Sequence, residues 1–333
     1  GLYLENGDDQ LMLFRVDAIY SFDGLVAEVA ERLSAETGVD MTDKVVITTS
    51  HTHNQPGNYS DQVHFYLGGD RYNPEIFERF VEAFVQVGLD AYSTRQDAAI
   101  GTHWLKDWDP EDRVYRDRRS DNDDLTIWED FTPGEYKDPY ANILRVDAVD
   151  GSPIAMVVTF GIHGTLLGED NPMWSNDSTG GLEMVLEEQF DEPVVVMHLQ
   201  GAGGDASPGG RDEDFARAES IGHFAVDALM EAYDNTPTGS EPLDMETASR
   251  HIPQAHSDIH VTRNGTVDWY YRPYEEDYQA DDQIYDANGD IISPVDEYNA
   301  KYGAAFCGSD APLIPVGNIG SQVFPYSACM DVE

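Results

Sequence analysis

Apolar residues follow the spacing of helices and strands in turn over the first two thirds of the chain. Residues 24–37 and 74–92 carry apolar side chains on one helical face, and the β-branched run at 45–49 is typical of a buried strand. Further strands are expected at 11–18, 98–101, 143–149, 154–160 and 194–199, and further helices at 181–190 and 212–233. This alternation predicts an α/β fold, with a mixed or mostly parallel sheet layered with helices.

The helical spacing fades after Asp234. We therefore expect residues 1–235 to form an α/β core, and residues 236–333 to continue the same domain as long irregular loops. No stretch approaches the roughly 18 consecutive apolar residues of a membrane span, so no transmembrane segment is expected. An apolar run begins almost directly after Gly1, which predicts a processed or truncated start.

The charge narrows the classes of partner. The chain has 64 acidic and 19 basic residues, a formal net charge of −45. Such a field repels phosphate backbones and anionic headgroups, which argues against nucleic-acid binding and an electrostatic membrane anchor. We expect a secreted, periplasmic or cell-surface protein, in a salty or cation-rich medium. Cys307 and Cys329 are either joined by a disulfide, as an oxidising compartment allows, or unpaired.

Three apolar strands end in polar turns, and ligands bind outside the carboxyl ends of strands in such sheets. In the first turn, His51 and His53 are two residues apart and point to the same side if the segment is extended. A pair of imidazoles at this spacing indicates zinc. A hydrogen-bonded turn with incidental histidines is the alternative.

The other two turns carry weaker signals. His163 lies between Gly161 and Gly164, which leave room for a ligand or metal to approach; the alternative is a core histidine bonded to a backbone carbonyl. Asp205 and Ser207 follow a pair of glycines and can face one site. Ser207 could act as a nucleophile or orient substrate, and an ordinary Asx-type turn is the alternative.

Taken together and in order, these turns resemble the neutral ceramidase family of zinc-dependent ceramide amidases. The similarity extends over about residues 10–210. The family's T-H-T-H-S-G-P-type turn, N-R-S-P element, R-V-D-x-x-D-G-x-P stretch, H-G-T or H-P-T triplet and N-x-G-D-V-S-P-N turn correspond here to T-S-H-T-H-N-Q-P-G at 49–57, R-R-S-D at 118–121, R-V-D-A-V-D-G-S-P at 145–153, H-G-T at 163–165 and A-G-G-D-A-S-P-G at 202–209.

The resemblance implies roles for individual residues. His51 and His163 would be zinc ligands, and His53 would contact the reacting amide and its tetrahedral intermediate. Arg119 would stabilise charge or clamp the substrate. Asp205 and Ser207 fall on the family's Asp-x-Ser pair, which would provide either a serine nucleophile or support for a zinc-activated water.

The implied reaction is zinc-dependent hydrolysis of an N-acyl amide, from a ceramide-like N-acylsphingosine to a sphingoid base and a fatty acid. Metal-activated water is favoured over a serine nucleophile, because zinc lowers the pKa of bound water from about 15.7 to near 7. Two alternatives stay open. One is an amidase or esterase of the same family with a non-ceramide substrate, and the other is a non-catalytic binding or structural protein on the same scaffold.

The chain also departs from the family pattern. Zinc takes about four ligands, whereas only two are matched, and no counterpart of the family's later glutamate and tyrosine ligands is found before Glu333. Either a further polypeptide segment or subunit completes the site, or the site is rebuilt from Asp177, His198 and Asp205. Besides zinc, a structural calcium or magnesium ion is a possible cofactor. Asn54 stands where the family usually has serine, which leaves the substrate open.

Overall fold

The computed structural model describes residues 1–61, 71–117, 137–168, 171–204 and 206–239, and the backbone of 260–263 and 266–270. The chain divides into one unit of Gly1–Arg118 with Gly134–Ser249 and another of Arg119–Pro133 with Arg250–Glu333. In the second unit, β10 (His260–Arg263) and β11 (Thr266–Tyr270) pair as an antiparallel hairpin. Most of the expected loops after residue 235 and both cysteines lie outside the described residues, and the boundary near 235 stays a prediction.

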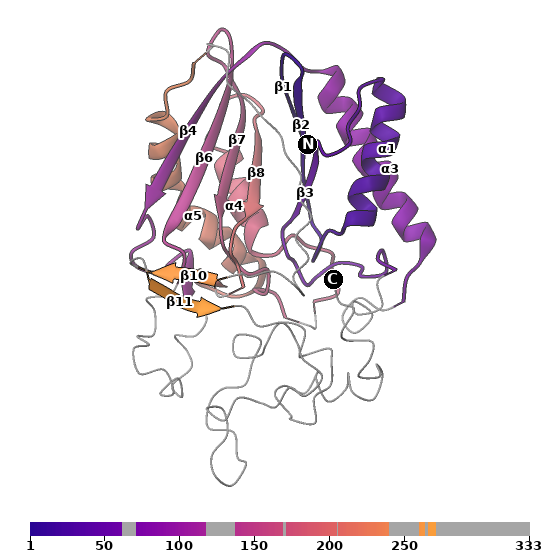
Figure 1. The fold of residues 1–333 in the computed structure, drawn as a ribbon. Coiled ribbons are helices and arrows are strands. Elements are labelled where there is room, and N and C mark those ends of the chain that lie inside the picture. The colour runs from indigo at the N-terminus through magenta and orange to yellow at the C-terminus, as the bar shows by residue number, and fades with distance from the viewer. Residues whose placement is uncertain are drawn as a thin grey trace. The chain divides into compact units, whose positions relative to one another are not determined.

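The first sheet contains the strands β1 (Leu2–Asn6), β2 (Asp9–Val16) and β3 (Val45–Thr49). They lie in that order, β1 antiparallel to β2 and β2 parallel to β3. The helices α1 (Asp23–Thr37) and α3 (Pro74–Ser93) cover one face of this sheet (Figure 1). Met12 and Phe14 of β2 point to this side and pack with Leu33 of α1 and Phe84 of α3.

The second sheet has the order β4-β6-β7-β8. Its strands are β4 (Ala98–Lys106), β6 (Tyr140–Ala148), β7 (Pro153–Phe160) and β8 (Val195–Gln200), and only β7 and β8 run parallel. The helices α4 (Ser178–Glu187) and α5 (Asp214–Asp234) cover one face (Figure 1). Val158 and Val196 of the sheet pack there with Leu182 of α4 and Ile221 of α5.

A smaller contact joins the two sheets. Side chains alternate between the faces of a strand. Leu13 of β2 therefore points away from α1 and α3, and it packs against Val157 of β7 and Met197 of β8. The helices thus lie on the outer faces, and the two sheets meet through their other faces. The strands β3, β7 and β8 all belong to the unit of Gly1–Arg118 with Gly134–Ser249, so the turns that follow them can meet.

The predicted α/β class is confirmed, and the sheets are mixed. The strand at 45–49 has its predicted bounds, and α1 and α3 each differ from the predicted helices by one residue at one end. The helices predicted at 181–190 and 212–233 are present as α4 and α5, with ends shifted by one to three residues. The sequence did not predict β1, nor the short pair β5 (Tyr115–Asp117) and β9 (Ala206–Pro208). Three-residue strands have too few positions for an alternating pattern, and pairing with a distant segment stabilises them. Among the described residues, no helix is long and apolar enough to cross a membrane.

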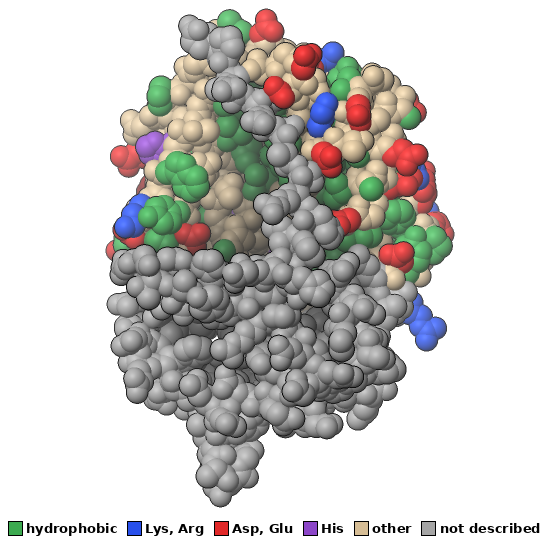
Figure 2. Space-filling model, viewed as in Figure 1, with side chains coloured by type: hydrophobic (Ala, Val, Ile, Leu, Met, Phe, Trp, Pro, Cys, Tyr) green, Lys and Arg blue, Asp and Glu red, His purple; other side chains and the backbone are tan. Residues whose placement is uncertain are grey.

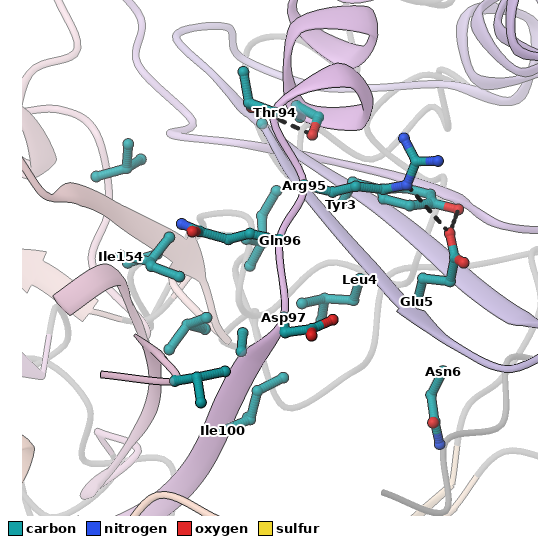
Figure 3. A pocket seen from close by; sticks show the side chains of 18 of the residues that line it. Tyr3, Leu4, Glu5, Asn6, Thr94, Arg95, Gln96, Asp97, Ile100 and Ile154 are labelled. Atoms are coloured by element: carbon teal, nitrogen blue, oxygen red, sulfur yellow. Dashed lines mark hydrogen bonds and ion pairs between the residues drawn. The ribbon is translucent and has the colours of Figure 1, made fainter. Parts of the chain in front are cut away.

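A hollow of about 880 Å³ lies between β1, the segment joining α3 to β4, and the amino ends of β7 and β8 (Figure 3). Leu4, Ile100 and Ile154 contribute apolar surface to it, and hydrophobic side chains are visible in the hollowed face in Figure 2. On its rim Glu5 pairs with Arg95 at 3.7 Å. The predicted functional turns follow the carboxyl ends of the strands, so this hollow is distinct from them.

Candidate metal centre

Three histidines from two turns lie together at the carboxyl ends of β3 and β7. The ring centroids of His51 and His163 are 4.5 Å apart, and those of His53 lie 5.1 Å from His51 and 5.4 Å from His163. One ring nitrogen from each of the three can be chosen so that all lie within 4.8 Å of one another. The turns after β3 and β7 therefore converge as the sequence predicts, and imidazole nitrogens are ligands that suit zinc.

Close backbone contact between the turns explains the glycines beside His163. Thr52 and Gly164 form a parallel β-bridge, and the His53 amide donates to the Gly164 carbonyl at 3.2 Å. A Cβ added at Gly164 would lie 2.4 Å from the His51 carbonyl oxygen, and one added at Gly161 would lie 2.4 Å from the Ala202 carbonyl oxygen. The sequence favours the interpretation that this space admits a ligand or metal. That interpretation is wrong, because the protein backbone fills the space.

Backbone carbonyls orient two of the three rings. His51 Nδ1 lies 2.7 Å from the Ile19 carbonyl oxygen, and His163 Nδ1 lies 3.0 Å from that of Gly203. A carbonyl only accepts hydrogen bonds, so Nδ1 is the donor in both rings, and in the neutral ring the lone pair is then on Nε2. This is the arrangement of metal-binding histidines in general, whose second nitrogen donates to a carbonyl or carboxylate. The two rings therefore fit a zinc ion.

The residues differ in exposure and backbone conformation. His163 is buried, His51 is half-buried and His53 is exposed. His51 has φ of 58°, in the left-handed region that few residues other than glycine adopt. Such a conformation at a functional site costs about 1–3 kcal/mol and persists only when surrounding contacts hold it. The bond from Nδ1 to Ile19 is one such contact.

The third predicted turn reaches the same place through β9. The His163 amide donates to the Ala206 carbonyl at 2.7 Å, and the next residue, Ser207, pairs with Arg116 of β5. The turn after β8 therefore joins the histidine turns. Arg119 and Asp205 lie outside the described residues, so their roles, like that of Ser207, stay predictions.

Asp177, a candidate for a rebuilt metal site, instead holds backbone. This buried N-cap of α4 accepts hydrogen bonds from the amides of Leu166 at 2.8 Å, Leu167 at 2.9 Å and Ser178 at 2.7 Å. Its second oxygen lies 3.4 Å from the side-chain nitrogen of Asn54. Burial raises the pKa of Asp177, although the three amide donors act in the opposite direction. Asp177 thus ties the His163 loop to α4 and to the His53 turn.

His198, the other described candidate, lies on the helix-covered side of the second sheet. Its side chain is fully buried, its Nε2 lies 3.1 Å from the Phe160 carbonyl oxygen, and its ring contacts the Phe160 ring at 4.6 Å. Burial lowers the pKa of His198 to about 3, so the ring is neutral near pH 7. Neither Asp177 nor His198 belongs to the His51–His53–His163 group, which among the described residues is the one group of three or more such side chains close enough to hold a metal ion.

Residues 4–220, which contain the whole histidine group, match the model of the family described as neutral/alkaline non-lysosomal ceramidase, N-terminal. The chain belongs to this ceramidase family. Among its curated relatives are neutral ceramidase A and neutral ceramidase B of Dictyostelium discoideum. Both are 21% identical to this chain, over 227 and 226 residues, which is 63% of this chain and 30% of each relative. The chain thus spans about a third of the length of these ceramidases.

Solved ceramidase structures have the same fold. The neutral ceramidase from Pseudomonas aeruginosa aligns with 68% of this chain and 37% of its own, with 20% identity and a TM-score of 0.58. A structure described as ceramidase complexed with C2 aligns with 68% of this chain and 36% of its own, with 20% identity and a TM-score of 0.59. At this identity the similarity establishes the shared α/β fold.

One residue at the candidate metal centre is not predicted from the sequence. Gln200, the last residue of β8, hydrogen-bonds to the backbone of Ser50 and Ile162, which directly precede His51 and His163. Its only signal in the sequence is a polar side chain at the end of an apolar strand. Its partners are backbone atoms, which every residue has, so the sequence does not identify them. Asn54, which the sequence indicates only as a departure from the family turn, is buried against Asp177.

Proposed function

We propose that this chain contributes to a zinc-dependent hydrolase that cleaves the N-acyl amide bond of a ceramide-like lipid, with the metal held by His51 and His163. The observation that carries the proposal is the histidine group, whose ring nitrogens lie within 4.8 Å of one another inside the region that matches the ceramidase family. The family and the names of its relatives support ceramide as the substrate.

The proposed ligands are favourable for zinc because their rings are held before any metal binds. The bonds from Nδ1 to Ile19 and Gly203 place the lone pair of each neutral ring on Nε2. Zinc takes about four ligands and keeps one position open for water or substrate in a catalytic site. The proposal therefore includes a further polypeptide segment or subunit that supplies the remaining ligands.

A zinc ion bound at this place would lower the pKa of a water molecule to near 7 and polarise the amide carbonyl. The residues of the chain bind and orient the substrate around it. His53 is the exposed member of the group, so its ring can donate a hydrogen bond to the carbonyl oxygen of an incoming amide. Arg119 is proposed to stabilise negative charge there, and Asp205 and Ser207 to orient the attacking water.

His53 also fits a second role. Its ring nitrogen lies close enough to the others to be a third ligand, whereas its exposure favours contact with substrate. The two roles differ in what His53→Ala does. Loss of a ligand lowers zinc affinity, while loss of a substrate contact leaves zinc bound and lowers kcat. We favour the substrate role, because His53 is the most exposed of the three.

The test uses the full-length protein, with zinc measured by elemental analysis and hydrolysis measured with a fluorescent N-acylsphingosine. We expect near-stoichiometric zinc and turnover, both lost in His51→Ala. The matched control is His223→Ala, since His223 is exposed on α5 and its Nε2 pairs with Glu219. Zinc binding with turnover of other amides or esters only would redirect the substrate assignment. A folded full-length protein without zinc would refute the catalytic proposal and favour a binding or structural role.

A further inference from the structure

Gln200 connects the two turns that carry the proposed zinc ligands. Its side-chain nitrogen donates to the Ser50 carbonyl at 3.2 Å and to the Ile162 carbonyl at 2.5 Å. Its side-chain oxygen accepts from the Ile162 amide at 2.8 Å. A glutamine amide has two N–H donors and one carbonyl oxygen, so both donors and the oxygen have backbone partners here.

We infer that Gln200 is a positioning residue that sets the spacing between His51 and His163, and this inference rests on the proposed function. Ser50 and Ile162 are the residues directly before the two histidines. Ser50 and Ile162 are both buried, with 0% of each exposed to solvent. A rotation of either turn would break a bond between the Gln200 amide and a buried backbone group, and an unsatisfied buried group costs about 1–3 kcal/mol.

The fold gives this one side chain its importance. His51 follows a strand of the first sheet and His163 a strand of the second. Where the turns meet, their backbones are joined by the Thr52–Gly164 bridge and the His53–Gly164 hydrogen bond, both after His51 in the chain. Gln200 supplies the link on the other side of His51. The two histidines are thus bracketed by fixed contacts.

The same residue is coupled to the orientation of the His163 ring. A Cβ added at Gly203 would lie 2.8 Å from the Gln200 side-chain oxygen, so the Gly203 backbone packs directly on this amide. The Gly203 carbonyl is the acceptor for His163 Nδ1. Loss of the amide therefore frees both the backbone before His163 and the backbone that orients its ring.

The experiment compares Gln200→Met and Gln200→Glu with Gln189→Met in the full-length protein. Methionine keeps the length of the side chain and removes its hydrogen bonds, and glutamate keeps acceptor oxygens and removes both donors. Gln189 is the matched control, because its amide donates to the Val185 carbonyl within α4, away from the histidine turns.

Three readouts separate positioning from general stability. We expect zinc affinity, measured by competition with a chelator, to fall about tenfold in both Gln200 variants, in the range found when groups that orient ligands are removed. The visible spectrum of the cobalt-substituted protein should shift. In the metal-free protein, nitrogen NMR should show that the Nδ1–H tautomers of His51 and His163 become mixed. Gln189→Met should leave all three unchanged.

Failure of the positioning role can be distinguished from failure of the proposed function. A wild-type protein without zinc contradicts the proposed function, whereas the tautomers in the metal-free protein still test the positioning role. Gln200 variants with wild-type tautomers, or with wild-type zinc affinity and cobalt spectrum where zinc binds, overturn the inference. So do Gln200 variants that fail to fold while Gln189→Met folds, because Gln200 would then act on global stability.

Discussion

The imidazole rings of His51 and His163 lie 4.5 Å apart and nearly perpendicular, at 89°, although they follow strands of two different sheets. Each ring is held by a bond from Nδ1 to a backbone carbonyl, at Ile19 and Gly203. The pair is thus arranged by the protein itself, and a metal would meet rings already in place. The backbone contacts that hold the pair can each be tested by substitution.

The first prediction concerns the left-handed backbone of His51, which has φ of 58°. Glycine adopts this conformation without steric cost, whereas alanine does not. We expect the free energy of unfolding of His51→Gly to be about 1 kcal/mol higher than that of His51→Ala, although both variants lose the same side chain. The glycine variant is thus the more stable of the two. Urea denaturation of the metal-free proteins measures the difference.

His53 provides the control for this comparison, because it is not among the described residues with positive φ. There glycine only adds freedom to the unfolded chain, so His53→Gly should be less stable than His53→Ala by up to about 1 kcal/mol. The sign of the difference is therefore opposite at two residues in the same turn. The same sign at both positions would contradict the assigned conformation of His51.

The second prediction concerns Asp177. In Asp177→Asn the new amide group would face the Leu167 amide where the second carboxylate oxygen stood, so two donors would meet. We expect a loss of about 2 kcal/mol in the free energy of unfolding, measured by denaturant titration. Asn has the same branching and number of heavy atoms as Asp, so the steric cost of φ 58° and ψ −135° at this position should stay the same.

Asp150→Asn is the control for Asp177, since Asp150 is exposed and accepts bonds from Ser152 only within its own turn. It should change stability much less than Asp177→Asn. We also expect zinc affinity to fall in Asp177→Asn, because Leu166 and Leu167 continue the loop of His163. Equal stabilities for Asp177→Asn and the wild type would show that the carboxylate does not hold this loop.

The sequence predicted that the turns with the three histidines meet, but it did not predict the contacts that support them. His51, His53 and His163 stand directly after apolar strands, so the topology of an α/β sheet was enough to bring their turns together. Asp177 binds the backbone amides of Leu166 and Leu167. Gln200 binds the backbone of Ser50 and Ile162. Every residue has these backbone atoms, so no pattern of side chains in the sequence predicts the contacts.

The strands likewise divide into those that the local sequence predicts and those that depend on a distant partner. The run at 45–49 is buried and β-branched, so its local pattern was sufficient, and its predicted bounds match β3. The strand β9 consists of Ala206–Pro208 and exists because it pairs with β5. Its formation depends on a partner far away in the chain, which local propensity does not encode. The prediction that the glycines beside His163 leave room for a ligand fails for a related reason. Their neighbours are backbone atoms of other turns, which the local sequence does not indicate.

The third prediction follows from the formal net charge of −45. Mutual repulsion of carboxylates destabilises the compact state, and salt screens it over a Debye length that falls from about 10 Å at 0.1 M to about 3 Å at 1 M. We expect the thermal midpoint to rise by several degrees between about 0.05 and 1 M NaCl and to change less above that. Differential scanning calorimetry measures it. An equal ionic strength of KCl should give the same rise, and a midpoint independent of salt would contradict the argument.

The fourth prediction is a pH dependence of stability from His198. Burial, with a smaller contribution from the Arg15 guanidinium, lowers its pKa to about 3, against about 6.5 in the unfolded chain. Between these values the unfolded state binds a proton that the folded state does not. The contribution of His198 is therefore fully present above about pH 6.5 and is lost as the pH falls toward 3, by at most about 1.4 kcal/mol per pH unit.

Glu183 works in the opposite direction over part of this window. Burial raises its pKa to about 7, more than Arg15 lowers it, so its contribution is full below the unfolded value near 4.5 and is lost as the pH rises to 7. The comparison of wild type with His198→Gln separates the two, because Glu183 accepts a bond from the backbone amide of residue 198, which the variant keeps.

We expect the stability advantage of the wild type over His198→Gln to shrink steadily as the pH is lowered from 6.5 to 4, measured by urea denaturation. The exposed His223→Gln is the control and should show no comparable trend against the wild type. A constant difference between wild type and His198→Gln over this range would mean that His198 takes up its proton equally well in the folded and unfolded states. Its ring would then have to reach water, which is incompatible with a side chain buried between Phe160 and the helices.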